Sequence, residues 1–310
     1  MNKIIRIGTR ESELALWQAK TVQKALENLG HKTELIPIKS LGDIQLDKPL
    51  YDMGITGIFT KTLDIALLSG EIDIAVHSMK DVPTRLPQEI IAGAVLKREN
   101  PIDLLLHNGL DFLRKEEHEN NQVVIATGSL RRKAQWLAKY PSHKIVNIRG
   151  NVNTRMHKLV ENAWQGAIFA AAGLERIEKR PDDALELDWM LPAPAQGAML
   201  VVTKEKDDFC RKALFPLNHE KSAICTHIER EFLKTLEGGC TAPIGALAQI
   251  EDEMVSFKGG LFGLDGKQKF IEGISFPIEE YIGAGAKAAN SILSRGGSDL
   301  MIEIKQRLEK

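Results

Sequence analysis

Short apolar runs alternate with amphipathic helical patterns along the first part of this chain, and this alternation limits the possible folds. The order is strand 3–10, helix 12–29, strand 31–40, helix 60–70 and strand 72–78. In the first helix, apolar residues recur every three or four positions and Gly30 supplies the stop. Strands that alternate with helices are typical of a parallel sheet with helices on its faces.

The same order then restarts. It runs through strand 121–129, helix 130–140, strand 143–150, helix 151–164 and strand 166–173. Polar stretches at residues 96–101 and 114–122 separate this second α/β unit from the first. The segment "LPAPAQGAMLVV", residues 191–202, interrupts the alternation of strands and helices with two prolines, and another apolar strand follows.

The composition changes from about Asn218 onward. A helix at residues 224–239 leads into strands at 245–251 and 254–263, and one last helix is predicted at 282–294. This part is interpreted as a small α+β domain. A length of 310 residues is compatible with two or three domains in all.

Composition and charge exclude several classes of protein. Hydrophobic residues make up 43% and charged residues 27%, which is ordinary for a globular protein with sizeable cores. A net charge of −1 gives no overall field toward nucleic acid or membrane, and no apolar run is long enough to span a bilayer. Three cysteines without a C-x-x-C pair argue against a disulfide framework or a metal site. We therefore expect a reduced, cytoplasmic protein without a metal.

Basic and hydroxyl side chains stand at the carboxyl ends of the predicted strands, where open α/β sheets bind ligands. They are Arg10, Ser12, Thr127, Ser129, Arg131, Arg132, Arg149, Arg155 and Arg176. Helix N-termini attract anions, and guanidinium groups pair bidentately with carboxylate or phosphate. Any one arginine could be a solvated surface charge, but six at corresponding positions favour a polyanionic ligand. Phosphate is less well supported, because no Walker or G-x-G-x-x-G loop is present.

The segment "VHSMKDVPT" adds Lys80 and Asp81 at the end of a predicted strand. An aspartate just before Val-Pro is often only a turn former. Among arginines, however, a carboxylate is badly placed to bind an anion. It is well placed to stabilise a cation that forms during a reaction.

A lone cysteine, Cys240, lies in "LEGGCTAPIG" directly after Gly238 and Gly239. The glycines remove side chains next to the sulfur and permit unusual backbone angles, which suits a thiol presented to a bulky group. The alternative is a turn that contains a cysteine by chance. These residues alone leave both interpretations open.

Seven segments in order resemble the porphobilinogen deaminase (hydroxymethylbilane synthase) family. They are "TRESELALWQA", "IAVHSMKDVPT", "TGSLRRKAQ", "IRGNVNTR", "AAAGLERI", "PAPAQGA" and "LEGGCTAPIG", between about residues 4 and 250. The resemblance implies an α/β fold of two lobes like type II periplasmic binding proteins, each with a parallel or mixed sheet, plus a small C-terminal α+β domain. The implied domains are 1–96 with 197–216, 97–196, and 217–310, joined by crossovers near 96–101 and 191–197.

The resemblance also implies an activity. The family joins four porphobilinogen molecules head to tail, releasing ammonia each time, on a covalent dipyrromethane cofactor. Hydrolysis then frees the linear tetrapyrrole hydroxymethylbilane for porphyrin and heme biosynthesis. Such an enzyme is a transferase, expected here as a cytoplasmic monomer without nucleic-acid, membrane or obligate protein partners.

Site residues follow from the same resemblance. The implied catalytic residues are Asp81, Lys80 and Arg10, with Asp81 facing pyrrole N–H groups and stabilising the cation formed as ammonia leaves. The cofactor would be attached through a thioether to Cys240 and held by Asp81, Lys80, Thr127, Ser129, Arg131, Arg132 and Gly173. Substrate would be bound by Arg10, Ser12, Lys61, Arg149, Arg155, Arg176 and Gln196.

One departure from the family pattern lies in "MGITGIFTKTLD". Ile55 and Thr56 stand where the family has Gly-Lys, which removes one cation, whereas Lys61 remains. Two alternatives are therefore a non-catalytic two-lobed anion-binding module and an enzyme relic that turns over poorly. The module would explain the arginines but not Cys240 on its bare segment or Asp81 among basic residues.

Overall fold

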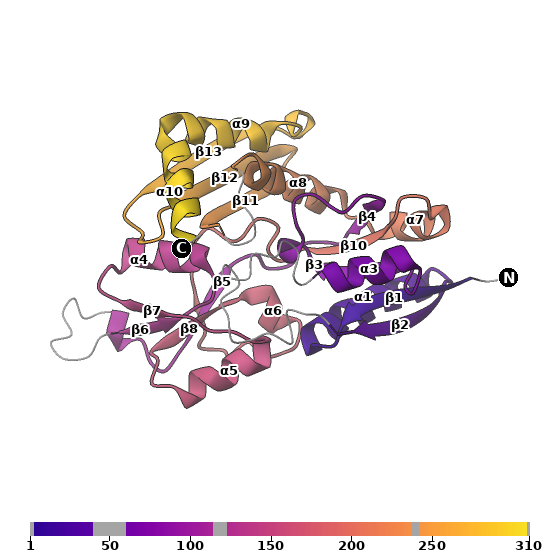
Figure 1. Ribbon diagram of the computed structural model, residues 1–310, viewed down its shortest axis with the longest axis horizontal. Coiled ribbons are helices and arrows are strands. Elements are labelled where there is room, and N and C mark those ends of the chain that lie inside the picture. Colours follow the sequence, from indigo (N-terminus) through magenta and orange to yellow (C-terminus); the bar gives the residue numbers. More distant parts are fainter. Residues whose placement is uncertain (1–2, 40–59, 114–122, 237–241, 309–310) are drawn as a thin grey trace.

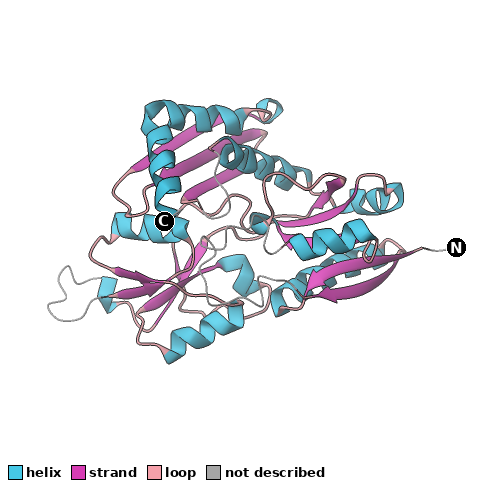
Figure 2. Cartoon of the chain, in the orientation of Figure 1, coloured by secondary structure: helices cyan, strands magenta, loops and turns pink. Residues whose placement is uncertain are grey.

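Three β-sheets organise the protein. The computed structural model describes residues 3–39, 60–113, 123–236 and 242–308. Two sheets have five strands and one has three. In Figure 1 the first sheet lies on the right, the second at the lower left and the third at the top, and Figure 2 shows helices packed around all three.

The first sheet is mixed. Its strands, in spatial order, are β2 (Lys32–Ile38), β1 (Ile4–Arg10), β3 (Ile74–Ser78), β10 (Met199–Lys204) and β4 (Ile90–Val95). Strand β10 runs antiparallel to both β3 and β4. Helices α1 (Glu13–Asn28) and α7 (Asp208–Leu214) pack on one face, and α3 (Lys61–Ser69) packs on the other.

The second sheet repeats this arrangement. Its order is β7 (Lys144–Val146), β6 (Val124–Ala126), β8 (Gly166–Ala170), β5 (Asp103–His107) and β9 (Leu185–Glu186). Strand β5 is antiparallel to β8. Buried Trp136 of α4 (Leu130–Lys139) packs on one face, whereas α5 (Val152–Glu161) and α6 (Ala171–Glu175) cover the other.

The prediction of a parallel or mixed sheet in each lobe is confirmed, and both sheets are mixed. The three strands predicted from each alternating pattern are parallel, as expected. Strands β4 and β5 were not predicted. Strand β10 is the reversed strand of the first sheet and β5 is that of the second, so both sheets are mixed. A chain that crosses between two sheets re-enters each of them from the opposite direction, and this produces the antiparallel pairs.

The third sheet is antiparallel, in the order β11 (Ile244–Glu251), β12 (Met254–Phe262) and β13 (Lys269–Pro277). Its buried face packs against α8 (Glu220–Thr235), α9 (Ala284–Ile292) and α10 (Ser298–Leu308). Neither β13 nor α10 was predicted. The last helix predicted from the sequence, at residues 282–294, corresponds to α9, and the backbone leaves the helical region at Arg295 and Gly296 before α10 begins.

Contacts with both crossover segments and with α4 dock the third domain. Buried Glu229 of α8 accepts a bidentate pair from Arg98 and hydrogen bonds from Ala195 N (2.6 Å) and Ala248 N (2.7 Å). Gly266, with φ of +76°, approaches so closely that a Cβ there would lie 2.4 Å from Ala138 N of α4. A side chain at this turn would push the third domain away from the second sheet.

The two larger lobes also touch directly. Glu13 of α1 accepts from Lys179 Nζ and from Asn153 Nδ2 of α5, both at 2.7 Å. These groups are exposed or half-buried, so solvent screens each pair and neither contributes much to stability. Lobe contact at this edge is therefore weak compared with the docking at Glu229.

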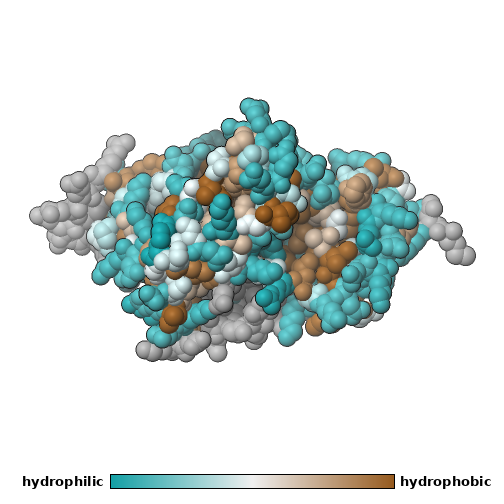
Figure 3. All heavy atoms as spheres, turned by 90° about the horizontal axis from the view of Figure 1, so that it is seen from above, coloured by the Kyte–Doolittle hydropathy of each residue, from teal (hydrophilic) through white to brown (hydrophobic). Residues whose placement is uncertain are grey.

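The outer surface is mainly polar. In the space-filling view, hydrophilic residues cover much of the face shown and apolar residues form several separate groups (Figure 3). Within the described ranges, no helix has the combination of length and apolar character that crossing a membrane requires.

Candidate active site

Charged side chains from several elements meet near the carboxyl ends of the strands. Burial lowers the pKa of Arg155 on α5 to about 10, and the positive charges of Arg132, Arg149 and Arg10 add to this effect, whereas Asp81 opposes it. These residues come from α4, α5, the end of β1 and the turn after β3. The structure thus brings Asp81 into one basic group with four of the predicted arginines.

His77 adds no charge to this group near neutral pH. It is buried in β3, and burial together with the nearby charge of Arg10 lowers its pKa to about 4. The imidazole is therefore neutral at pH 7.

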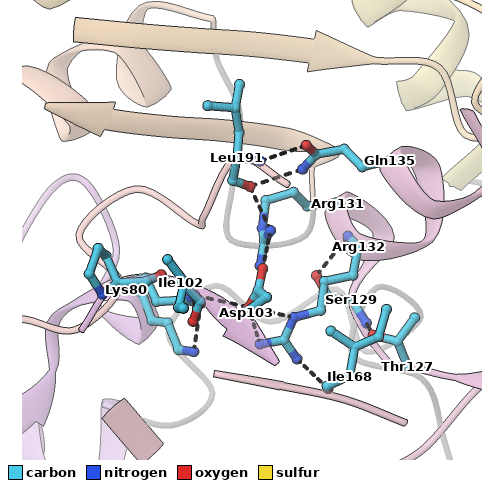
Figure 4. A network of polar contacts seen from close by, with 12 residues as sticks. Lys80, Ile102, Asp103, Thr127, Ser129, Arg131, Arg132, Gln135, Ile168 and Leu191 are labelled. Carbon is cyan, nitrogen blue, oxygen red and sulfur yellow. Dashed lines mark hydrogen bonds and ion pairs between the residues drawn. The ribbon is translucent and has the colours of Figure 1, made fainter. Parts of the chain in front are cut away.

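Arg131 and Arg132, at the start of α4, are held by one buried carboxylate (Figure 4). Asp103 accepts from Arg131 Nη1 at 2.7 Å, and from Arg132 Nη2 at 2.7 Å and Nε at 3.0 Å. Burial by itself raises the pKa of Asp103, but the two guanidinium charges outweigh this and hold the pKa well below its usual range. Asp103 is thus ionised, and it fixes the orientation of both arginines.

Gln196 links this cluster to the first lobe. Its Nε2 donates to Asp103 Oδ1 at 2.9 Å, and its Oε1 accepts from Lys80 Nζ at 3.1 Å. Gln196 lies in the second crossover and is buried. Lys80 and Asp103 therefore sit at either end of a hydrogen-bonded chain between the two sheets.

Lys80 is half-buried, and its ammonium group has an altered pKa. Burial and, next, the charge of Arg132 lower this pKa to about 8, against the opposing effect of Asp81 and Asp103. Lys80 is therefore the cation of this group that changes its charge nearest to neutral pH.

The predicted hydroxyl groups cap helices and turns. Ser12 is the N-cap of α1 and accepts from Ala15 N, and Ser129 is the N-cap of α4 and accepts from Arg132 N, both at 3.4 Å. Thr127 Oγ1 accepts from Ser129 N at 3.2 Å. In these hydrogen bonds the hydroxyl oxygen accepts, so each O–H can still donate to a ligand.

The side chain of Arg131 has one buried donor to spare. Its Nε is buried and makes no hydrogen bond among the residues that the structure describes. An unsatisfied buried donor is costly, and the cost is larger for a charged group. A carboxylate oxygen from a ligand would satisfy it.

Three other predicted residues, Arg176, Lys61 and Gly173, lie outside the group of charged side chains around Asp81 and Asp103. Arg176 is buried at the crossovers, where it pairs with Glu99 and donates to Gly197 O at 2.8 Å. Lys61 is exposed at the start of α3. A Cβ on Gly173 of α6 would lie 3.7 Å from Leu14 Cδ2, so the two lobes come close at this glycine.

Cys240, Ile55 and Thr56 lie outside the described residues. The other two cysteines are buried, and burial raises the pKa of Cys210 to about 12 and of Cys225 to about 11. Both thiols thus stay protonated near neutral pH. Over the described ranges, no three His, Cys, Asp or Glu side chains are placed to hold a metal ion.

Sequence reasoning missed Asp103, which organises the cluster. It heads the apolar strand "DLLLH" and is fully buried. A buried aspartate must be paired. Two features of the sequence could have indicated this residue. One is an acidic residue at the start of an apolar run, and the other is a pair of adjacent arginines that have no acidic neighbour on their own helix.

Comparisons with known proteins give the family of this chain. Residues 5–212 match the family model "Porphobilinogen deaminase, dipyromethane cofactor binding domain", and residues 223–294 match "Porphobilinogen deaminase, C-terminal domain". Among solved structures, the methionine-binding protein MetQ is 16% identical with a TM-score of 0.44, covering 69% of this chain and 89% of its own.

Curated relatives carry the same family name. Porphobilinogen deaminase of Geobacter sulfurreducens is 39% identical over 98% of this chain and 95% of its own length. That of Syntrophomonas wolfei is 39% identical over 97% and 99%. A probable porphobilinogen deaminase of Methanocaldococcus jannaschii is 44% identical over 81% and 84%. With family models covering most of its length and relatives aligned nearly end to end, this chain belongs to the porphobilinogen deaminase family.

Proposed function

We propose that this chain has hydroxymethylbilane synthase activity and that Asp81 is its central catalytic group. It joins four porphobilinogen molecules on a covalently bound dipyrromethane and releases the linear tetrapyrrole by hydrolysis. The observation that carries the role of Asp81 is its position within a group of cations from both lobes. A purely anion-binding module has no use for a carboxylate there.

The residues present fit a dipyrromethane. Each of its pyrroles carries an acetate and a propionate, so its carboxylates match the clustered cations. Lys80, Arg131 and Arg132 would hold these carboxylates, and the spare buried Nε of Arg131 supports this assignment. Cys240 would provide the thioether. When bound, the dipyrromethane supplies the free pyrrole carbon to which the first substrate is joined.

We assign two tasks to Asp81. Each condensation breaks the C–N bond of porphobilinogen, releases ammonia and forms a C–C bond to the waiting pyrrole carbon. The carboxylate of Asp81 stabilises the positive charge that develops on the substrate as ammonia leaves. It can then accept the proton that the pyrrole carbon loses when the new bond has formed.

The remaining predicted residues bind and orient the chain as it grows. Arg10 and Arg149 lie near Arg155 and would bind substrate carboxylates. Ser12, Thr127 and Ser129 would donate hydrogen bonds from the helix starts, and Gln196 would keep Lys80 in place. Lys61 and Arg176 would also bind substrate, Lys61 from the start of α3 and Arg176 beside the crossovers, whereas Gly173 would lie against the cofactor.

The value of kcat/KM for porphobilinogen is expected to fall as the pH rises through about 8. Lys80, whose pKa is about 8, then loses the charge with which it would hold a carboxylate of the bound dipyrromethane. Losing one charge-assisted hydrogen bond costs about 1.5–3 kcal/mol, which corresponds to a roughly tenfold or larger fall in kcat/KM. The measurement is kcat/KM from pH 7 to 9.5 for the wild type and for Lys80→Arg. The arginine variant should lack this fall, and parallel profiles would contradict the assignment.

Intact mass under denaturing conditions tests the proposed function. We expect the purified wild type to exceed its polypeptide mass by two linked pyrrole units. Cys240→Ser should have the bare mass, because it lacks the thiol that forms the thioether. A wild type that stays bare after incubation with porphobilinogen would favour the anion-binding module instead.

We also propose the division into domains 1–96 with 197–216, 97–196, and 217–310. The return of β10 to the first sheet and the antiparallel third sheet support it. We further propose that the protein acts as a cytoplasmic monomer, without a nucleic acid or an obligate protein partner. The two buried, protonated thiols and the net charge of −1 are compatible with this.

A further inference from the structure

A side chain of the third domain holds the turn that carries Asp81. This 3-10 turn, Met79–Asp81, follows β3 in the first lobe. Arg230 of α8 donates from Nη1 to Val82 O at 2.8 Å and to Met79 O at 3.3 Å, and from Nη2 to Pro83 O at 2.6 Å. The three accepting carbonyls stand on both sides of Asp81 in the sequence.

These carbonyls lie outside the strands of the first sheet. The turn has its own hydrogen bonds from Val82 N to Met79 O at 3.2 Å and from Met79 N to Ala198 O at 3.0 Å. Buried carbonyls need donors. Arg230 supplies these donors from one planar, rigid guanidinium group, whose Nη1 and Nη2 bind different carbonyls of the turn and so restrain it at two points.

The side chains of the turn provide the other half of this anchor. Met79 and Val82 are buried in the core of the first lobe. Their burial fixes the turn toward the sheet, whereas Arg230 fixes it toward α8. Asp81 lies between these two anchors and is itself half-buried.

Helix α8 has a second connection to the site. The neighbouring Glu229 binds Arg98 and Ala195 N of the two crossovers, and α8 ends at Thr235, shortly before Cys240 in the sequence. One helix therefore holds the Asp81 turn, holds the crossovers and leads into the segment with the cofactor cysteine. A contact that fixes Asp81 relative to α8 therefore also fixes it relative to Thr235, the last residue of α8, from which the chain continues toward Cys240.

We propose that Arg230 is a positioning residue that sets the place of the Asp81 carboxylate during each condensation. This inference rests on the proposed function of Asp81. A misplacement of about 1 Å at a reacting group can cost about 100-fold in rate. Because Arg230 contacts backbone carbonyls of the turn, its loss should lower kcat much more than it raises KM.

The test compares Arg230→Met, Arg230→Lys and the control Arg295→Met. Arg295 also lies in the third domain and also donates to backbone carbonyls, those of Ser291 and Ile271, but far along the chain from the Asp81 turn. We expect Arg230→Met to lower kcat by about 10- to 100-fold with KM within about twofold. Arg230→Lys, which keeps a charge and a donor, should recover part of the rate, and Arg295→Met should match the wild type.

A double-mutant cycle with Asp81→Glu shows whether Arg230 acts through Asp81. If it does, Arg230→Met should cost much less in the Asp81→Glu background than in the wild type. An equal cost in both backgrounds, or a wild-type kcat in Arg230→Met, would overturn the proposal. If Arg230→Met fails to fold, Arg230→Lys decides: a lowered kcat at normal KM supports the proposal, and a wild-type kcat overturns it.

Measuring the intact mass distinguishes a failure of the Arg230 proposal from a failure of the proposed function. Each variant is first checked for the mass excess of the covalent dipyrromethane. A wild type without that excess would remove the proposed function itself. A wild type and an Arg230→Lys variant that both carry it, with equal kcat, would remove only the role of Arg230.

Discussion

Asp81→Asn is expected to slow condensation by about 10²- to 10⁴-fold, the range typical for loss of a general acid–base group. Asparagine keeps the size of the side chain but removes the negative charge and the proton acceptor. Lys80 and Arg155 would then lie near a neutral amide, while the charge developing on the substrate would lack its counter-charge. The covalent dipyrromethane should remain attached.

Single-turnover rates and intact masses of Asp81→Asn check this expectation. The control is Asp208→Asn, which changes an exposed carboxylate in the same lobe that pairs with nearby Arg211 and should leave the rate unchanged. A wild-type rate in Asp81→Asn would remove this residue from the mechanism. A variant without the mass excess would place Asp81 in cofactor assembly rather than in turnover.

Asp103→Asn is expected to lower the free energy of unfolding by about 3–5 kcal/mol at pH 7, because it leaves two buried guanidinium groups without their anion. Arg131 and Arg132 both donate to this carboxylate, and all three side chains are buried. Asp103 has a lowered pKa in the folded protein, so the unfolded chain takes up a proton first as the pH falls. The stability that Asp103 contributes is therefore complete above its unfolded pKa of about 3.9 and is lost below it.

Denaturant unfolding, followed by circular dichroism between pH 3 and 7, measures both effects. The control is Asp188→Asn, which changes an exposed carboxylate of the same lobe and should alter the free energy by less than about 0.5 kcal/mol. The pH dependence below about 4 should be shallower in Asp103→Asn than in the wild type. A loss below 1 kcal/mol at pH 7 would mean that the arginines find another partner.

Local signals account for the elements that were predicted correctly. The first helix was expected over residues 12–29, and α1 has Ser12 as its N-cap and Leu29 as its C-cap. Such caps and apolar spacings lie within one segment and can be found in its sequence. The insertion of β10 beside β3 and β4 depends on pairing between distant segments, which no local pattern encodes.

The site residues also divide into those with a local sequence signal and those that depend on contacts between distant segments. Arg10, Arg131, Arg132, Arg149 and Arg155 could be predicted because strand ends and helix starts are local features. Asp103, the partner of Arg131 and Arg132, could not be assigned, because its contacts join β5 to α4 across the fold. Arg230 was missed because nothing in the sequence of α8 shows that its side chain reaches the turn after β3.

The position of β10 also governs the order in which a nascent chain can fold. Strands β3 and β4 each pair with β10 rather than with each other, so the first sheet stays open until residues 199–204 leave the ribosome. All strands of the second sheet, residues 103–186, are synthesised before that point. Of the two larger lobes, the one that is translated first is therefore completed second. Until β10 pairs, the edges of β3 and β4 stay open, and open strand edges promote aggregation because pairing between distant segments is slow.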